Sequence, residues 1–146
     1  WHDFTCDGVP FNLKLTNCAN TCENAFNKTA VIYSVTGRMP KSKNMCFNQF
    51  WREIQEKPWE DLAGTEYHYL VVNKVTSEAM IKSIFDIHKY YKNPCNILQV
   101  KWSHEFEHRD YKPTDLTEKK RELLRCIQAS VRAAIESQKD FADADI

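Results

Sequence analysis

The stretch Tyr67-His68-Tyr69-Leu70-Val71-Val72 decides the fold class of this chain. Aromatic and β-branched residues are enriched in strands, and here they occupy both alternating faces, which predicts a strand. Working outward, Phe11, Leu13 and Leu15 alternate with polar residues and predict another strand over 11–16. Two strands that lie far apart in the sequence are therefore expected to start a sheet.

Two further strands are predicted from similar patterns. The segment 30–36 is rich in β-branched residues and is followed by Gly37 and Pro40, which stop it. The segment 97–108 keeps a period of two, because every second residue from Leu98 to His108 is apolar or a histidine. We therefore expect about four strands.

The clearest helix signal follows Pro113. Asp115 is a good N-cap, Glu118 stands three residues later, and a long apolar stripe follows. Another apolar stripe predicts a helix over 45–57, which Pro58 ends.

Other segments carry weaker signals. A helix over 77–92 would place His88 on its buried side, where a hydrogen-bonded core residue is expected rather than a metal ligand. A short helix is expected within 17–26, and a turn at 59–65.

These elements predict the α+β class, with one sheet packed against helices. The length suits a single domain, 1–146, with an extended N-terminal arm at 1–10 and a frayed acidic tail at 140–146. An antiparallel sheet is favoured.

The cysteines predict an oxidising compartment. Six of them are scattered along the chain in spacings that fit no zinc ligand set, and an even number favours three disulfides. The pairing stays open among the six positions: Cys6, Cys18, Cys22, Cys46, Cys95 and Cys126. Asn27-Lys28-Thr29 is a glycosylation sequon, and the chain is expected to be a mature secreted protein.

Charge and hydropathy exclude two partner classes. Twenty basic residues balance twenty acidic ones, so no global field attracts nucleic acid, and no apolar run is long enough for a membrane span. We expect a monomer without a cofactor.

One motif could carry catalysis. His104-Glu105-Phe106-Glu107-His108 matches the HExxH pattern, which on a helix supplies two zinc ligands and a general base. A strand over 97–108 would hold the two histidines roughly 13 Å apart, so neither is expected to bind metal. Glu122 is a distant candidate for a third ligand. With the cysteines oxidised and no nucleophile motif present, we expect no enzyme activity.

The aromatic-rich stretch 47–59 is the best candidate for recognition, because Trp and Arg are common at interface hot spots. The competing expectation, which we favour, is that Phe50 and Trp51 fill the core.

The segment Trp51-Arg52-Glu53-Ile54 resembles the Trp-Arg motif of the Leptosphaeria avirulence and suppressing (LARS) effectors, which are small cysteine-rich proteins secreted by plant-pathogenic fungi. The resemblance implies a four-stranded sheet with flanking helices and disulfides, and it assigns Trp51 and Arg52 as signature positions. It also implies a virulence or avirulence role in the host apoplast.

The leading hypothesis is therefore a secreted, non-enzymatic effector that binds a host protein or immune receptor. One alternative is a salivary binding protein of an animal parasite or arthropod. The other is a small secreted zinc hydrolase that uses the motif at 104–108, and the conformation of 97–108 separates it from the first two.

Overall fold

The computed structural model describes residues 1–42, 44–56 and 66–146. The turn predicted at 59–65 lies outside the described residues. Strands and helices follow one another in this order: β1 (Phe4–Cys6), β2 (Val9–Thr16), β3 (Glu23–Asn24), α1 (Lys28–Thr36), α2 (Phe47–Gln55), β4 (His68–Asn73), β5 (Ala79–Ser83), β6 (Tyr91–Lys92), β7 (Leu98–Val100), α3 (Trp102–Glu107) and α4 (Leu116–Ala142). The α+β class is confirmed.

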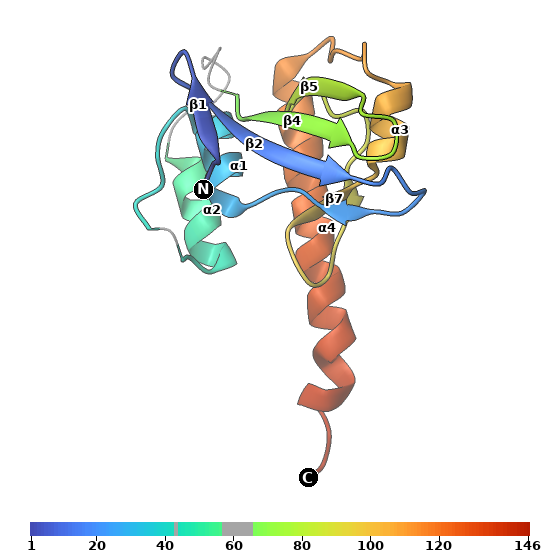
Figure 1. The fold of residues 1–146 in the computed structure, drawn as a ribbon. Helices are drawn as coiled ribbons and strands as arrows, with labels where there is room; N and C mark the ends of the chain where they lie inside the picture. The colour runs from blue at the N-terminus through green and yellow to red at the C-terminus, as the bar shows by residue number, and fades with distance from the viewer. Residues whose placement is uncertain (43, 57–65) are drawn as a thin grey trace.

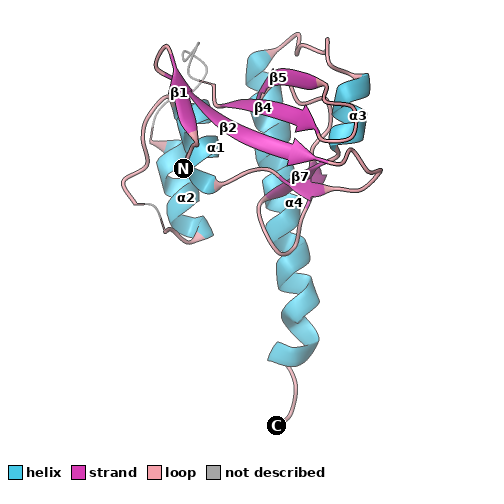
Figure 2. Ribbon diagram, in the orientation of Figure 1, coloured by secondary structure: helices cyan, strands magenta, loops and turns pink. Residues whose placement is uncertain are grey.

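The main sheet has four strands in the order β1-β2-β4-β5 (Figures 1 and 2). β1 and β2 form a hairpin whose turn residues Asp7 and Gly8 have φ values of 51° and 78°, as a tight hairpin turn requires. β2 then pairs with β4 in parallel, and β4 pairs with β5 antiparallel. The sheet is mixed, so the prediction of an antiparallel sheet was wrong.

Helices cover one face of the main sheet. Tyr69 and Val71 point inward from β4 into one hydrophobic core that includes Val31 of α1, Ile54 of α2 and Leu123 of α4. On the opposite face, Leu13 and Ile81 are 44% and 62% exposed. A small second sheet, β3-β7-β6, lies beside α4.

The segment predicted as a strand at 30–36 is helix α1. Asn27 caps it by accepting a hydrogen bond from the backbone N–H of Ala30 at 2.8 Å, and Gly37 ends it with a φ of 72°. The helix is buried on nearly every side, so its sequence shows no polar face. The helix predicted within 17–26 was also wrong, because these residues form loops and β3.

The helix predicted over 77–92 was wrong as well. Asn73 Oδ1 accepts hydrogen bonds from the N–H groups of Val75 and Thr76, which builds a turn and sends the chain back as β5. In β5 the inward positions are Met80 and Lys82, and both side chains are buried. A lysine in an inward position hides the strand period from a hydrophobicity pattern.

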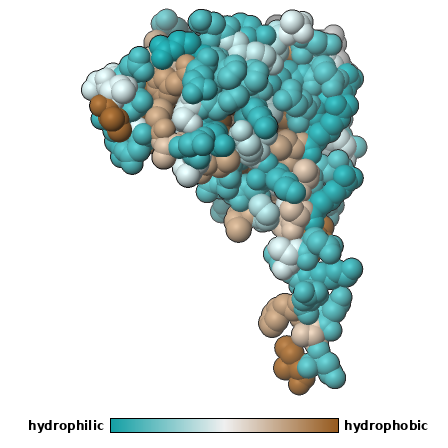
Figure 3. Space-filling model, turned by 90° about the vertical axis from the view of Figure 1, so that its right-hand side faces the viewer, coloured by the Kyte–Doolittle hydropathy of each residue, from teal (hydrophilic) through white to brown (hydrophobic). Residues whose placement is uncertain are grey.

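Both strong helix signals are confirmed. α2 lies within the predicted 45–57, and α4 begins after Asp115, whose side chain accepts from the N–H of Glu118 at 3.1 Å. α4 continues to Ala142, past the predicted start of the tail. Its C-terminal end, exposed from Ile135 onward, stands clear of the body of the molecule (Figures 1 and 3).

The six cysteines are all free thiols in this structure, and no two of them lie at bonding distance. They are spread over separate elements: Cys6 lies in β1, Cys46 at the start of α2, Cys95 between β6 and β7, and Cys126 in α4. The structure therefore does not contain the predicted framework of three disulfides.

Candidate metal centre

The segment 97–108 is not one continuous strand, and this changes the HExxH motif. β7 ends at Val100, and α3 begins at Trp102. The two inward residues of α3 are Trp102 and Glu105, which are 1% and 0% exposed and lie three positions apart, as one helix face requires. The period of two across this segment was a coincidence at the junction between a strand and a helix.

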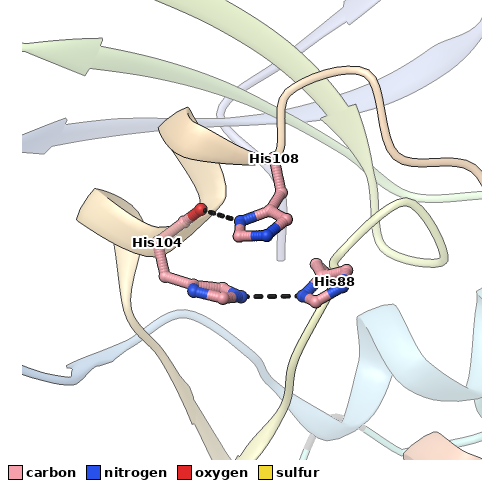
Figure 4. A group of neighbouring side chains, drawn as sticks. All are labelled: His88, His104 and His108. Carbon is pink, nitrogen blue, oxygen red and sulfur yellow. Dashed lines mark hydrogen bonds between the residues drawn. The ribbon is translucent and has the colours of Figure 1, made fainter.

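The helix brings His104 and His108 together, and a third histidine joins them. His88, from the segment between β5 and β6, meets both rings, and the nitrogen ligand atoms of the three residues all lie within 4.8 Å of one another (Figure 4). The ring centroids of His104 and His108 are 4.1 Å apart, and those of His88 and His108 are 4.2 Å apart. The three imidazole rings therefore lie together, with His108 stacked on both His88 and His104 at interplanar angles of 14° and 30°.

Hydrogen bonds indicate which nitrogens could face a metal ion. His108 Nδ1 lies 2.8 Å from the carbonyl oxygen of His104, so it carries a proton there and leaves Nε2 with a free lone pair. His88 Nδ1 and His104 Nε2 are 2.7 Å apart. Both nitrogens could serve as metal ligands only after they lose the shared proton and move apart, since a Zn–N bond is about 2.0–2.1 Å long.

At His88 the local electrostatics favour the neutral imidazole. Burial lowers the pKa of His88, and His108 and His104 lower it further because a second positive charge beside them is unfavourable. The ring of Tyr111 packs edge-on against His88, with centroids 4.9 Å apart. Neutral imidazole is the form that binds a transition metal.

The third ligand is not the one that the sequence suggested. His88 was expected on the buried face of a helix, but it lies in a bend outside regular structure. Glu122, the distant candidate, instead forms an ion pair with Lys119 at 3.2 Å. One sequence signal pointed to His88: three of the chain's five histidines fall between 88 and 108.

Glu105, the acid of the motif, has another role. Its side chain is fully buried, and its Oε1 accepts from the Lys82 ammonium at 2.9 Å and from the backbone N–H of His88 at 2.7 Å. Its Oε2 accepts from the N–H of Lys89 at 3.3 Å. With both oxygens engaged, Glu105 is placed to hold the segment that carries His88 and not to activate a metal-bound water.

Lys82 completes the support of the site. Besides Glu105, its ammonium donates to the carbonyl oxygens of Asp86 and His108, at 3.1 and 2.9 Å. One buried lysine therefore connects β5, the segment before His88 and the end of α3. Such a network fixes ligands before the metal arrives, which lowers the cost of ordering them on binding.

The other predicted site residues lie elsewhere. Trp51 is 50% exposed on α2, so the expectation that it fills the core was wrong, whereas Phe50 is buried as expected. Arg52 is also exposed. Asn27 is the N-cap of α1, and its amide nitrogen donates to the carbonyl oxygen of Trp1 at 3.3 Å. Glycosylation at Asn27 stays a prediction.

Comparisons with family models, with curated proteins and with solved structures find no match to this chain. The resemblance to the LARS effectors therefore stays a prediction. Among the described residues, no helix combines the length and the apolar composition that crossing a membrane requires.

Proposed function

We propose that this protein binds a divalent transition metal ion, zinc in the first place, through His88, His104 and His108. The observation that carries the proposal is the convergence of three histidine nitrogens within 4.8 Å of one another. Imidazole ligands suit zinc, copper and nickel, and three protein ligands leave a further coordination position open.

The site supports metal binding better than peptide hydrolysis by the HExxH mechanism. That mechanism needs the glutamate of the motif to act as a general base beside the metal-bound water. Here Glu105 is buried and engaged by Lys82 and by two backbone N–H groups. Glu105 therefore holds the segment that carries His88 in place and does not act as a general base.

Titration of metal-free protein with zinc, followed by isothermal calorimetry, tests the proposal. We expect one zinc ion per chain, with affinity reduced by at least about tenfold in each of His88→Ala, His104→Ala and His108→Ala, because each variant removes a ligand. His68→Ala is the matched control, since His68 lies in β4 and bonds the backbone carbonyl of Glu66. Cobalt substitution adds a spectroscopic readout of the coordination geometry.

Two results would contradict this proposal. One is an absence of zinc binding by the folded wild-type protein. The other is binding that survives all three single substitutions, which would place the ion elsewhere. Thermal unfolding of each variant without metal separates a lost ligand from a lost fold.

A second proposal is that the protein is a secreted effector that binds a host protein. It is supported by the exposure of Trp51 and Arg52 on one helix, where a partner could reach them. Infiltration of purified protein into leaves of varied plant genotypes tests it, with Trp51→Ala as the variant and Val75→Ala as an exposed control. Genotype-dependent cell death that Trp51→Ala abolishes is expected, and no response across a broad panel would count against the proposal. A salivary binding protein, the alternative within this class, would give no response in leaves.

Alkylation without reductant tests whether the secreted protein keeps the free thiols of this structure. The backbone N–H of Gln49 lowers the pKa of the exposed Cys46 thiol, whereas burial raises the pKa of Cys126. We expect iodoacetamide to modify Cys46 faster than Cys126 near neutral pH, because the thiolate is the nucleophile. Six unreactive cysteines would instead restore the disulfide prediction.

A further inference from the structure

Helix α4 carries an apolar stripe that continues beyond the body of the molecule. Its positions alternate in steps of three and four residues, which is the spacing of a coiled-coil seam, and one of them, Gln138, is polar: Leu124, Ile127, Val131, Ala134, Gln138 and Phe141. The first part of this stripe is covered, since Ile127 is 3% exposed. Phe141, at the projecting end, is 79% exposed. Ile135, which follows the stripe position Ala134, is 65% exposed.

The covered part of the stripe forms one wall of a groove. Leu124, Ile127 and Val131 of α4 face the aromatic side chains of α2 across a cavity of about 390 Å³, to which Phe47, Phe50 and Trp51 contribute. Trp51 is half exposed at this groove. The groove is mainly apolar, and a large apolar side chain is the natural occupant.

The two ends of α4 carry opposite charge. The ten residues 116–125 contain four basic and two acidic side chains, whereas the ten residues 136–145 contain one basic and four acidic ones. Arg121 and Arg125 are exposed and line the groove. The acidic residues of the other end surround Phe141 in sequence.

The projecting end of α4 has no buried face among the residues that the structure describes. In proteins most of the stability of a helix comes from the packing of an apolar face. Residues 136–146 are all exposed, although the helix runs to Ala142. A partner that packs on the stripe would supply the missing burial.

We propose that two copies of this chain associate through α4 in antiparallel orientation. In that register Phe141 of each copy lies opposite Leu124 of the other, beside the aromatic side chains of α2, and Val131 lies opposite Ala134. The acidic end of each α4 then meets Arg121 and Arg125 at the groove of the other copy. The contact is isologous, so it closes on itself as a dimer.

This proposal departs from the monomer that the sequence predicts, and sedimentation equilibrium over a concentration series decides between them. We expect a dimer for the wild type at about 0.1 mM, where interfaces of modest area assemble. Phe141→Asp should weaken the dimer by at least tenfold, because it places a charge in the apolar groove. Val75→Asp is the control, since Val75 is similarly exposed, at 74%, but lies in the turn between β4 and β5.

Charge reversal tests the antiparallel orientation. The groove variant Arg121→Glu/Arg125→Glu and the tail variant Asp143→Lys/Asp145→Lys should each weaken self-association, because like charges then meet at both ends of the pair. A mixture of the two variants should form a heterodimer. The acidic groove of the groove variant then meets the basic tail of the tail variant, and the basic groove of the tail variant meets the acidic tail of the groove variant.

Three outcomes would overturn the proposal. A wild type that stays monomeric throughout the series would show that the groove is filled by something other than a second copy. Self-association unaffected by Phe141→Asp would place the interface elsewhere. Charge-reversed variants that associate as well as the wild type would exclude the antiparallel arrangement. Circular dichroism of each variant verifies that α4 remains helical.

Discussion

Two ion pairs at opposite regions of this molecule have almost the same length and very different surroundings. At the histidine cluster, Lys82 and Glu105 lie 2.9 Å apart with side chains 1% and 0% exposed. At the α2–α4 groove, Arg125 and Glu118 lie 2.7 Å apart with side chains 65% and 52% exposed. The two buried charges interact with each other and with backbone groups in place of water. Removal of either one therefore leaves the other buried without a compensating charge. Burial, and not distance, decides what each pair contributes.

We expect the largest change in the free energy of unfolding from Lys82→Met. This variant leaves the Glu105 carboxylate buried without its cation, which should lower the free energy of unfolding by about 3 to 5 kcal/mol. Urea unfolding of metal-free protein measures the change. Arg125→Met is the matched variant at the other region, and a similar loss for both would contradict the comparison.

The double variant Lys82→Met/Glu105→Leu sharpens the same point. Replacing a buried ion pair by apolar residues of similar size is often neutral, so we expect stability to recover substantially. The zinc affinity of the double variant should stay below that of the wild type, because the N–H groups of His88 and Lys89 lose their acceptor. A zinc affinity equal to that of the wild type would show that the ion pair does not position the ligands.

An intermediate effect is expected from Ile127→Val in the covered part of the groove. Ile127 is buried, and the loss of one methylene should cost about 0.5 to 1.5 kcal/mol of unfolding free energy. Zinc affinity should be unchanged, because Ile127 lines the α2–α4 groove and is not one of the proposed ligands. A change in zinc affinity would show that the two regions are coupled.

The smallest effect is expected from Arg125→Gln. Exposed ion pairs contribute at most about 1 kcal/mol and often nothing measurable, so dilute protein should unfold within about 0.5 kcal/mol of the wild type. Differential scanning calorimetry in low and high salt measures this difference in stability. A loss approaching that of Lys82→Met would refute the distinction between the two pairs.

The sequence predicted those elements in which apolar residues recur on one face. α2 and α4 have polar faces and clear ends, and the strands at β2 and β4 have β-branched or aromatic residues at regular intervals. The pattern failed at α1, which is buried on nearly every side and was predicted as a strand, and it failed where a charged residue takes an inward position. Lys82 in β5 and Glu105 in α3 are both buried, each because the other neutralises it. A hydrophobicity pattern cannot identify such a pair, since each charge is placed by a partner far away in sequence.

The candidate metal site could be predicted only in part, for the same reason. The motif at 104–108 was recognised, but the strand assignment separated its two histidines. His88 lies sixteen positions before His104, and only the fold brings them together, through a backbone segment that Glu105 holds. A ligand supplied by an irregular segment leaves no periodic signal.

The parallel pairing of β2 with β4 has a consequence for how the chain acquires its structure. Phe11 pairs with His68 and Thr16 with Asn73, so the centre of the sheet closes a loop that contains α1 and α2. Loop closure of this size is entropically costly, and topologies rich in distant contacts fold slowly. During synthesis β2 emerges well before its partner strand, so the backbone N–H and C=O groups on the edge that β4 later covers are available to other chains. Nascent chains are therefore expected to need protection from aggregation until β4 has left the ribosome.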